Sequence, residues 1–199
     1  DHRHAITGGV ILDLRDDPGG VMQEAIKLSD LFLSEGVIVS TRSRLQGDEE
    51  VDTATLGDPW EEIPLVVLVN QSSASASEIV AGCLKDNDRA KIVGEKTFGK
   101  GSVQKILPIN GQQGAALRLT TAKYYTPSHE VIHGHGIEPD HNLKMSREDE
   151  ELLFLQRTPG GLKMVAEDRR EAVGNFIDPQ LAKAIELLVG KKQIQAKAE

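Results

Sequence analysis

Two short segments of the chain contain side chains that are suited to acyl transfer. The first, residues 70–78, is rich in serine and alanine and lies between an apolar run at 65–70 and a predicted helix. Such a turn presents a hydroxyl at the edge of a sheet, where a helix N-terminus stabilises negative charge on a carbonyl oxygen. The segment is a candidate for the nucleophile, but Ser75 and Glu78 also fit the pattern of a helix capping box.

The second segment, residues 94–104, is rich in glycine and supplies a candidate base. Lysine has a reference pKa of about 10.4, and burial lowers that value by several units because it penalises the ammonium. Glycines on both sides of Lys100 would let this backbone approach a sheet closely. Taken alone, the segment favours an exposed lysine in a glycine turn, and only the serine segment makes Lys100 a candidate base. A phosphate-binding loop is not indicated, because Gly101 rather than Ser or Thr follows the lysine.

Histidines form a third conspicuous group near residues 129–141. A metal site, a histidine for a serine hydrolase and a loop of exposed histidines are the three interpretations. Because the spacing fits no standard zinc pattern, we predict no metal and no cofactor. The residues concerned are His129, His133, His135 and His141, with Asp140 beside them.

The elements that must position these segments are apolar strands separated by amphipathic helices. This order predicts an α/β layered core with mixed sheet pairing. The polar residues 44–59 are predicted to be a surface excursion. Strands are predicted at 9–15, 37–41, 65–70 and 91–94, a helix at 21–33, a hairpin at 102–107 and Ala116–Tyr125, and C-terminal helices at 147–155, 161–170 and 179–188.

The composition is that of one globular domain with an acidic surface. The 199 residues are 39% hydrophobic and carry a formal net charge of -8, which disfavours general binding to nucleic acid. The single cysteine, Cys83, cannot form an internal disulfide and is predicted to be a small buried hydrophobe. No apolar run approaches the length of a membrane span, and no export segment opens the chain.

Four motifs in order give the chain a specific resemblance. Together they resemble the carboxyl-terminal processing peptidases, the tail-specific proteases of family S41, over about residues 9–140. The resemblance implies a ClpP/crotonase-like layered core, and we expect a catalytic core at 1–140 and a helical region at 141–199. The motifs lie at 11–20, 73–79, 94–104 and 119–127, with a fainter match at 178–181.

The resemblance implies a role for six residues. Ser75 would be the nucleophile of a Ser–Lys dyad, Lys100 its general base, and Gln104 the group that orients the lysine. The N–H of Ala76 and an N–H of Gly19 or Gly20 would form the oxyanion hole. The implied reaction is cleavage of protein chains near their C-termini through an acyl-enzyme.

The same resemblance implies the partners and the location. The substrate would be a protein or peptide with an apolar C-terminal tail, captured in this family by an upstream PDZ domain whose pattern this sequence lacks. A homo-oligomer and an extracytoplasmic location, in a bacterial periplasm or cell envelope, are also expected. Two alternatives are a non-catalytic binding module on the same fold and a Ser–His hydrolase that uses His133 or His135.

Overall fold

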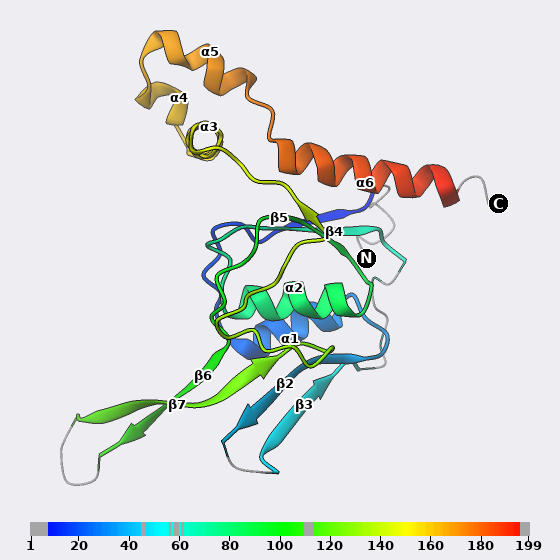
Figure 1. The fold of residues 1–199 in the computed structure, drawn as a ribbon. Helices are drawn as coiled ribbons and strands as arrows, with labels where there is room; N and C mark the ends of the chain where they lie inside the picture. The colour runs from blue at the N-terminus through cyan, green and yellow to red at the C-terminus, as the bar shows by residue number, and fades with distance from the viewer. Residues whose placement is uncertain are drawn as a thin grey trace.

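The computed structural model describes residues 8–44, 47–55, 57, 60, 62–109 and 114–195. Strands and helices alternate in the first half, and helices dominate the last quarter (Figure 1). The elements are β1 (Val10–Asp13), α1 (Met22–Asp30), β2 (Val37–Ser43), β3 (Glu49–Thr53), β4 (Leu65–Val69), α2 (Ala76–Asp86), β5 (Lys91–Gly94), β6 (Ser102–Pro108), β7 (Ala116–Tyr125), β8 (His141–Asn142), α3 (Arg147–Arg157), α4 (Gly161–Met164), α5 (Glu167–Asn175) and α6 (Pro179–Gln195).

The strands form two separate sheets. Sheet A has the order β1-β4-β5-β8 and is parallel throughout, whereas sheet B has the order β3-β2-β7-β6 and is antiparallel. Parallel neighbours need a crossover, and α2 provides it between β4 and β5. The predicted α/β layered core is therefore confirmed, with parallel and antiparallel pairing divided between two sheets.

Strand β4 lies at the centre of the molecule and is buried along its whole length. Leu65, Val67 and Val69 pack into the cluster that contains the buried residues of α1 and α2. Val66 and Leu68 face the other way and pack in a second cluster that contains two α6 residues, Ala184 and Leu188. Since successive side chains of a strand point to opposite faces, a continuous apolar run is the pattern of a sheet covered on both sides.

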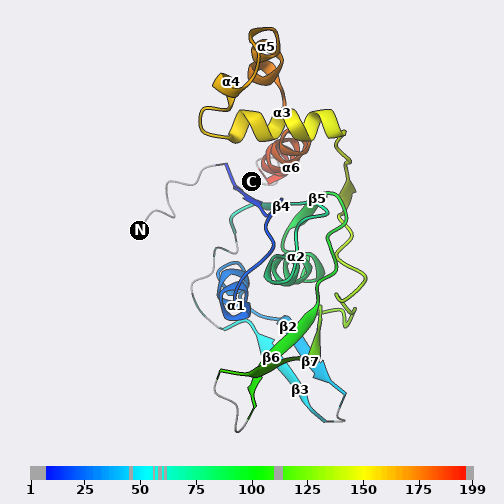
Figure 2. The same cartoon turned by 90° about the vertical axis from the view of Figure 1, so that its left-hand side faces the viewer.

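The molecule is thus layered as α6, sheet A, the pair α1 and α2, and sheet B (Figures 1 and 2). Ile38, Val39 and Tyr124 of sheet B pack on the helices. Beyond the helices the hairpin of β6 and β7 projects from the body (Figure 1). This hairpin confirms the predicted pairing of 102–107 with Ala116–Tyr125.

Two sequence predictions were wrong in detail. The polar stretch 44–59 contains β3, which pairs antiparallel with β2 and places Glu50 opposite Thr41. Nearly all side chains of β3 are exposed, so no apolar alternation marks it as a strand. The single helix predicted at 161–170 is divided into α4 and α5.

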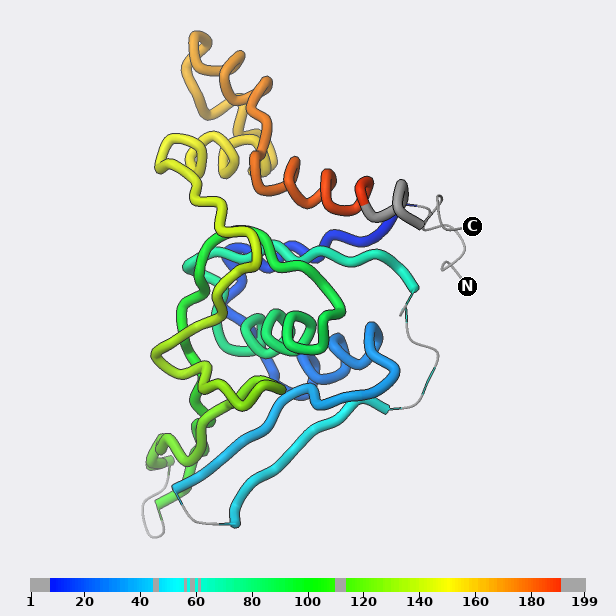
Figure 3. Tube along the Cα trace, turned by 45° about the vertical axis from the view of Figure 1, so that its right-hand side comes forward, coloured from blue at the N-terminus to red at the C-terminus, as the bar shows by residue number. Residues whose placement is uncertain are grey.

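The C-terminal helices have two different environments. Helices α3, α4 and α5 pack on one another away from the sheets, while α6 lies across sheet A (Figure 3). In the described part of the chain, no helix combines the length and the apolar character needed to cross a membrane.

A buried arginine joins the start of the fold to α6. Arg15, just after β1, donates to Asp13 (2.8 Å), to Asp178 (2.8 Å) and to the Gln180 amide oxygen (2.9 Å). Burial alone would raise the pKa of both aspartates, but hydrogen bonds from Arg15 and its charge outweigh this and hold each pKa below its ordinary value. The weak motif at 178–181 is thereby connected to the strong motif at 11–20.

Candidate active site

Ser75 stands at a sharp turn between a buried strand and a helix. Strand β4 ends at Val69, and α2 begins at Ala76, directly after the serine. Ser75 has φ 61° and ψ -116°, a backbone conformation that residues with a side chain rarely adopt. Such a strained residue persists only where its surroundings hold it, and it is a signal of function.

The serines of this turn differ in how their hydroxyls are used. Ser73 is fully buried and its hydroxyl donates to the Leu14 carbonyl (2.7 Å). The Ser77 hydroxyl donates to the Asp17 carbonyl (3.2 Å). Ser75 is half-buried, and with Glu78 it forms a capping box at the start of α2.

Glu78 connects the serine turn to the glycine-rich segment. Its fully buried Oε2 accepts the N–H of Ser75 (2.9 Å) and the N–H of Lys100 (2.8 Å). Its Oε1 accepts the Gly99 N–H (2.7 Å) and the Thr97 hydroxyl (2.5 Å). Because a carboxylate offers about four lone-pair sites, these donors use its full capacity. The backbones of Ser75 and Lys100 are therefore held side by side.

The glycine-rich segment packs closely against the loop that follows β7. A Cβ atom on Gly101 would lie 2.4 Å from the His133 nitrogen, and the Gly134 N–H donates to the Gly99 carbonyl (2.9 Å). Only glycine fits at position 101. The Lys100 side chain itself is exposed.

The turn of Gly19 and Gly20 lies directly against Ser75. Gly19 has φ 84°, and a Cβ there would lie 2.4 Å from the Ala74 carbonyl oxygen and 3.0 Å from the Ser75 Cβ. The Gly19 N–H donates to the Asp17 carboxylate (3.0 Å). In the described ranges, the N–H groups of Gly20 and Ala76 have no hydrogen-bond partner. These two amides are thus the free donors next to the serine.

Gln104 is exposed on β6, four residues after the lysine. A bulge interrupts the pairing with β7 between Val103 and Gln104. Val103 and Lys105 both line a cleft, which places Gln104 on the opposite face of the strand. Among the described residues, no hydrogen bond joins Gln104 to Lys100.

The histidines are spread over different parts of the structure. The Nδ1 atom of His129 lies 2.8 Å from an Arg42 nitrogen, and His141 is in β8. His133 and His135 are exposed, and neither has a hydrogen bond to Ser75 in the described part of the chain. Within those same residues, no group of three or more His, Cys, Asp or Glu side chains is arranged to hold a metal ion.

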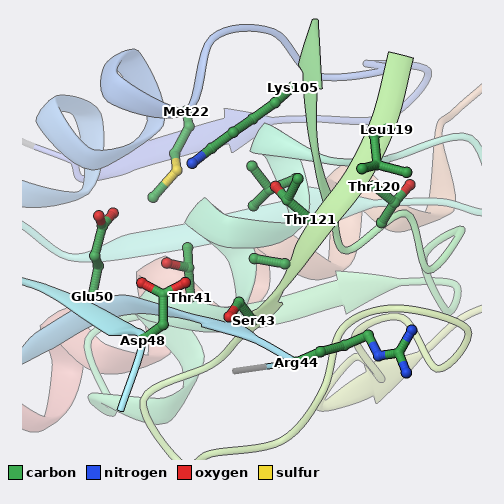
Figure 4. Close-up of a pocket in the computed structure, with 12 residues that line it drawn as sticks. Met22, Thr41, Ser43, Arg44, Asp48, Glu50, Lys105, Leu119, Thr120 and Thr121 are labelled. Carbon is green, nitrogen blue, oxygen red and sulfur yellow. The ribbon is translucent and has the colours of Figure 1, made fainter. Parts of the chain in front are cut away.

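Two clefts border the serine turn, and a third lies on sheet B. An apolar cleft of about 240 Å³ lies between α1 and α2 beside Gly20 and Ala76, with Leu28 and Val80 in its walls. A second, of about 540 Å³, lies on the Ser72 side. A third, of about 490 Å³, lies between Met22 and sheet B (Figure 4). A polypeptide therefore has access to the turn from two sides.

The sequence predicted a serine and a lysine as candidates but did not predict the carboxylate that joins their backbones. The capping-box pattern correctly pairs Glu78 with the Ser75 amide. It carries no information about Thr97, Gly99 and Lys100, which reach the same carboxylate from another segment. The available signal was a glutamate inside an otherwise apolar helix, because such a buried charge requires several hydrogen bonds.

Comparison with known proteins places the chain in a family. Residues 4–143 match the model of peptidase family S41. A carboxy-terminal-processing protease of Bartonella bacilliformis is 58% identical over 132 residues, which cover 66% of this chain and 30% of that protein. A chloroplastic carboxyl-terminal-processing peptidase of Arabidopsis thaliana is 42% identical over 144 residues, covering 72% of this chain and 28% of the relative.

Solved structures give the same picture. The photosystem II D1 C-terminal processing protease superposes with a TM-score of 0.64 and 36% identity, over 69% of this chain and 35% of that one. A structure from Bacteroides fragilis covers 96% of this chain and 47% of its own, with a TM-score of 0.62 and 17% identity, and so shows the fold alone. The chain spans about 30% of the length of the first curated relatives.

Proposed function

Because this chain belongs to peptidase family S41, we propose that it is a serine endopeptidase that cleaves protein chains near their C-termini with a Ser75–Lys100 dyad. The observation that carries the proposal is the buried Glu78 carboxylate, which accepts the main-chain N–H of both residues. A fold that only needed to cap α2 would not require the second contact. Ser75 also resembles the nucleophile of other hydrolases in occupying a strained strand-to-helix turn.

The reaction proceeds by acyl transfer. The neutral Lys100 amine takes the proton from the Ser75 hydroxyl as Oγ attacks the scissile carbonyl carbon, and the lysine becomes an ammonium. The tetrahedral intermediate collapses, the C–N bond breaks, and the ammonium returns the proton to the leaving amine. Water then attacks the ester, with Lys100 again as base, and releases the new C-terminus.

The oxyanion of each intermediate needs N–H donors that are free before the substrate binds. Ala76 and Gly20 meet this requirement, whereas the Gly19 N–H is already bonded to Asp17. We therefore assign the donors to Ala76 and Gly20, and to Gly19 the role of allowing the turn to approach Ser75. Gln104 keeps its proposed role of orienting the lysine only once a substrate has brought the two side chains together.

The exposed Lys100 must lose its water before it can act as a base, because burial favours the neutral amine. A substrate segment lying over the lysine supplies this cover. Catalysis then begins only when a polypeptide is bound. Without a bound substrate the dyad is inactive, and other proteins are not cleaved.

The wider assignments follow from the relatives. Their names as carboxyl-terminal-processing proteases support a protein substrate, for which we propose an apolar C-terminal tail. Occurrence of such relatives in bacteria and in a chloroplast supports an extracytoplasmic location. We also propose a catalytic core at 1–140 and a helical region at 141–199, which should unfold together because α6 packs on sheet A.

Cleavage of an unfolded protein with an apolar C-terminal tail tests the proposal. Ser75→Ala and Lys100→Ala should each reduce kcat by about 10³-fold or more, since removing a member of a catalytic unit costs this much. Lys96→Ala is the matched control, because Lys96 lies in the same segment but pairs with Glu138 at the surface (2.7 Å). Its activity should equal that of the wild type.

Each alternative predicts a different result. Wild-type cleavage by Ser75→Ala would reject the dyad, and tolerance of Lys100→Ala with loss in His133→Ala or His135→Ala would indicate a Ser–His hydrolase. Inhibition by a chelator while both dyad variants stay active would indicate a metal enzyme. Binding of the tail without cleavage by the wild type would indicate a binding module.

A further inference from the structure

We infer that one face of the β6–β7 hairpin, the face that carries Leu107, Leu117 and Leu119, binds an extended apolar segment of the protein substrate and directs it to Ser75. The inference rests on the proposed function and adds the place where the substrate chain lies. We call Leu107, Leu117 and Leu119 the leucine stripe.

The leucine stripe is an apolar surface on one face of the hairpin. Side chains two apart in a strand share a face, so Leu107 lies on the same face of β6 as Lys105 and Val103. Across the pair, Leu117 stands opposite Leu107, and Leu119 stands opposite Lys105. The three leucines are 42%, 51% and 45% exposed. Three neighbouring leucines that are each about half exposed to water indicate a surface that another apolar group covers.

The stripe continues into the cleft of about 490 Å³ between sheet B and the start of α1 (Figure 4). Val103, Leu119 and Met22 are its apolar walls, and Figure 4 shows Lys105 extending toward Met22. The Thr121 hydroxyl, which also belongs to the cleft lining, is buried and has no hydrogen-bond partner among the described residues.

Two residues that line the cleft are close in sequence to the proposed catalytic groups. Met22 comes two residues after Gly20, and Val103 comes three residues after Lys100. The walls of the cleft are therefore continuous along the chain with the Gly19–Gly20 turn on one side and with Lys100 on the other. This continuity favours a substrate segment over any unrelated ligand.

Charge in the cleft indicates what the segment contains. Asp48, Glu50, Arg44 and Lys105 all line the cleft, so its two negative and two positive charges balance. A balanced lining does not select a strongly charged partner, and recognition then depends on apolar side chains. We expect binding to change little with salt, because screening acts mainly on exposed charge pairs.

The experiment measures binding of a fluorescent 15-residue peptide with a Leu-Val-Ala-rich C-terminal tail to the Ser75→Ala protein by anisotropy. Leu107→Ser combined with Leu117→Ser should weaken binding about tenfold or more. Ile106→Ser is the matched control, because Ile106 is 70% exposed on the same strand but on the opposite face. The control should leave the dissociation constant unchanged, and thermal unfolding confirms that all variants remain folded.

Equal binding by the stripe variant and its parent would overturn the inference, as would equal weakening by Ile106→Ser. A second copy of this chain is the competing occupant of the stripe, and light scattering distinguishes it. If the parent is an oligomer that the stripe variant dissociates while peptide binding persists, the stripe is a contact between copies and the inference fails.

A second measurement separates this inference from the proposed function. In the active protein, the stripe variant should lose kcat/KM for a long tailed substrate but keep the wild-type rate on a tripeptide nitroanilide, which is too short to reach the stripe. Peptide binding that depends on the stripe, together with wild-type cleavage by Ser75→Ala, would retain the binding surface and reject the dyad. Cleavage that requires the dyad, together with an unchanged kcat/KM in the stripe variant, would retain the dyad and reject the binding surface.

Discussion

Ser75 and Lys100, 25 residues apart in the sequence, donate their main-chain N–H groups to the same oxygen atom, Glu78 Oε2, at 2.9 and 2.8 Å. Their two amide nitrogens are consequently no farther apart than the sum of these bond lengths. A shift of either segment breaks a hydrogen bond to a buried charge, so the positions of the two backbones are coupled.

Glu78→Gln should uncouple them. The amide group can accept at only one of its two ends, which leaves buried N–H donors unpaired at a cost of about 1–3 kcal/mol each. We expect reduced stability in urea unfolding and a fall in kcat of about 100-fold, the effect of a small misplacement of reacting groups, with KM little changed. Glu35→Gln, at an exposed position, is the control. A full wild-type kcat in a folded Glu78→Gln protein would show that the carboxylate only caps the helix.

Gly19→Ala should damage the turn beside the serine. Its φ of 84° costs about 1–3 kcal/mol for a residue with a side chain, and the added Cβ would meet the Ala74 carbonyl oxygen at 2.4 Å. We expect lower stability by calorimetry and loss of peptide cleavage. Gly174→Ala, in α5 with open space around the new Cβ, should be neutral or slightly stabilising. Normal cleavage by Gly19→Ala would mean that the turn moves away from Ser75 without consequence.

The network of Arg15 should make stability fall in acid. The folded protein holds the pKa of Asp13 and Asp178 below the unfolded value of about 3.9, so the unfolded state binds more protons as pH falls. This stabilisation is present above that value and is lost as pH drops through the folded pKa. Urea unfolding between pH 7 and pH 2 should show the decrease.

Asp178→Asn should flatten the same pH profile. It leaves part of the Arg15 charge without its partner and should lower stability at pH 7 by about 3 kcal/mol. Glu186→Gln, which removes only a surface pair with Lys183, should keep the wild-type profile. An unchanged slope in Asp178→Asn would assign the acid sensitivity to other carboxyls.

The thiol of Cys83 should not react in the folded protein. Burial raises its pKa to about 12, so almost no thiolate exists at pH 8. A chromogenic disulfide reagent should therefore label the native chain slowly and the urea-unfolded chain completely. Rapid labelling without denaturant would contradict the buried position of α2.

The sequence predicts those elements whose pattern is set by their own burial. The apolar run Leu65–Val69 indicates a strand covered on both faces, and the structure shows this. Strand β3 could not be predicted, because its polar side chains are exposed and only pairing with β2 makes it a strand. Position 100 shows a further limit, since no local pattern reports that the lysine is open to solvent.

Contacts between distant segments were the other part that the sequence could not supply. The motif at 11–20 and the match at 178–181 were both visible, yet their meeting through Arg15 and Asp178 depends on the position of α6 in space. The triple use of Glu78 by Thr97, Gly99 and Lys100 is of the same kind. Such hydrogen bonds are selected by the tertiary fold and leave no periodic signal.

The two faces of β4 are covered by helices that are synthesised at different times. During synthesis, Val66 and Leu68 emerge more than a hundred residues before Ala184 and Leu188, which cover them. Until α6 has been synthesised, the face of sheet A that carries Val66 and Leu68 remains exposed to water and Arg15 lacks its partner Asp178. A nascent chain therefore contains Ser75 and Lys100 long before it contains the helix that covers the far side of sheet A.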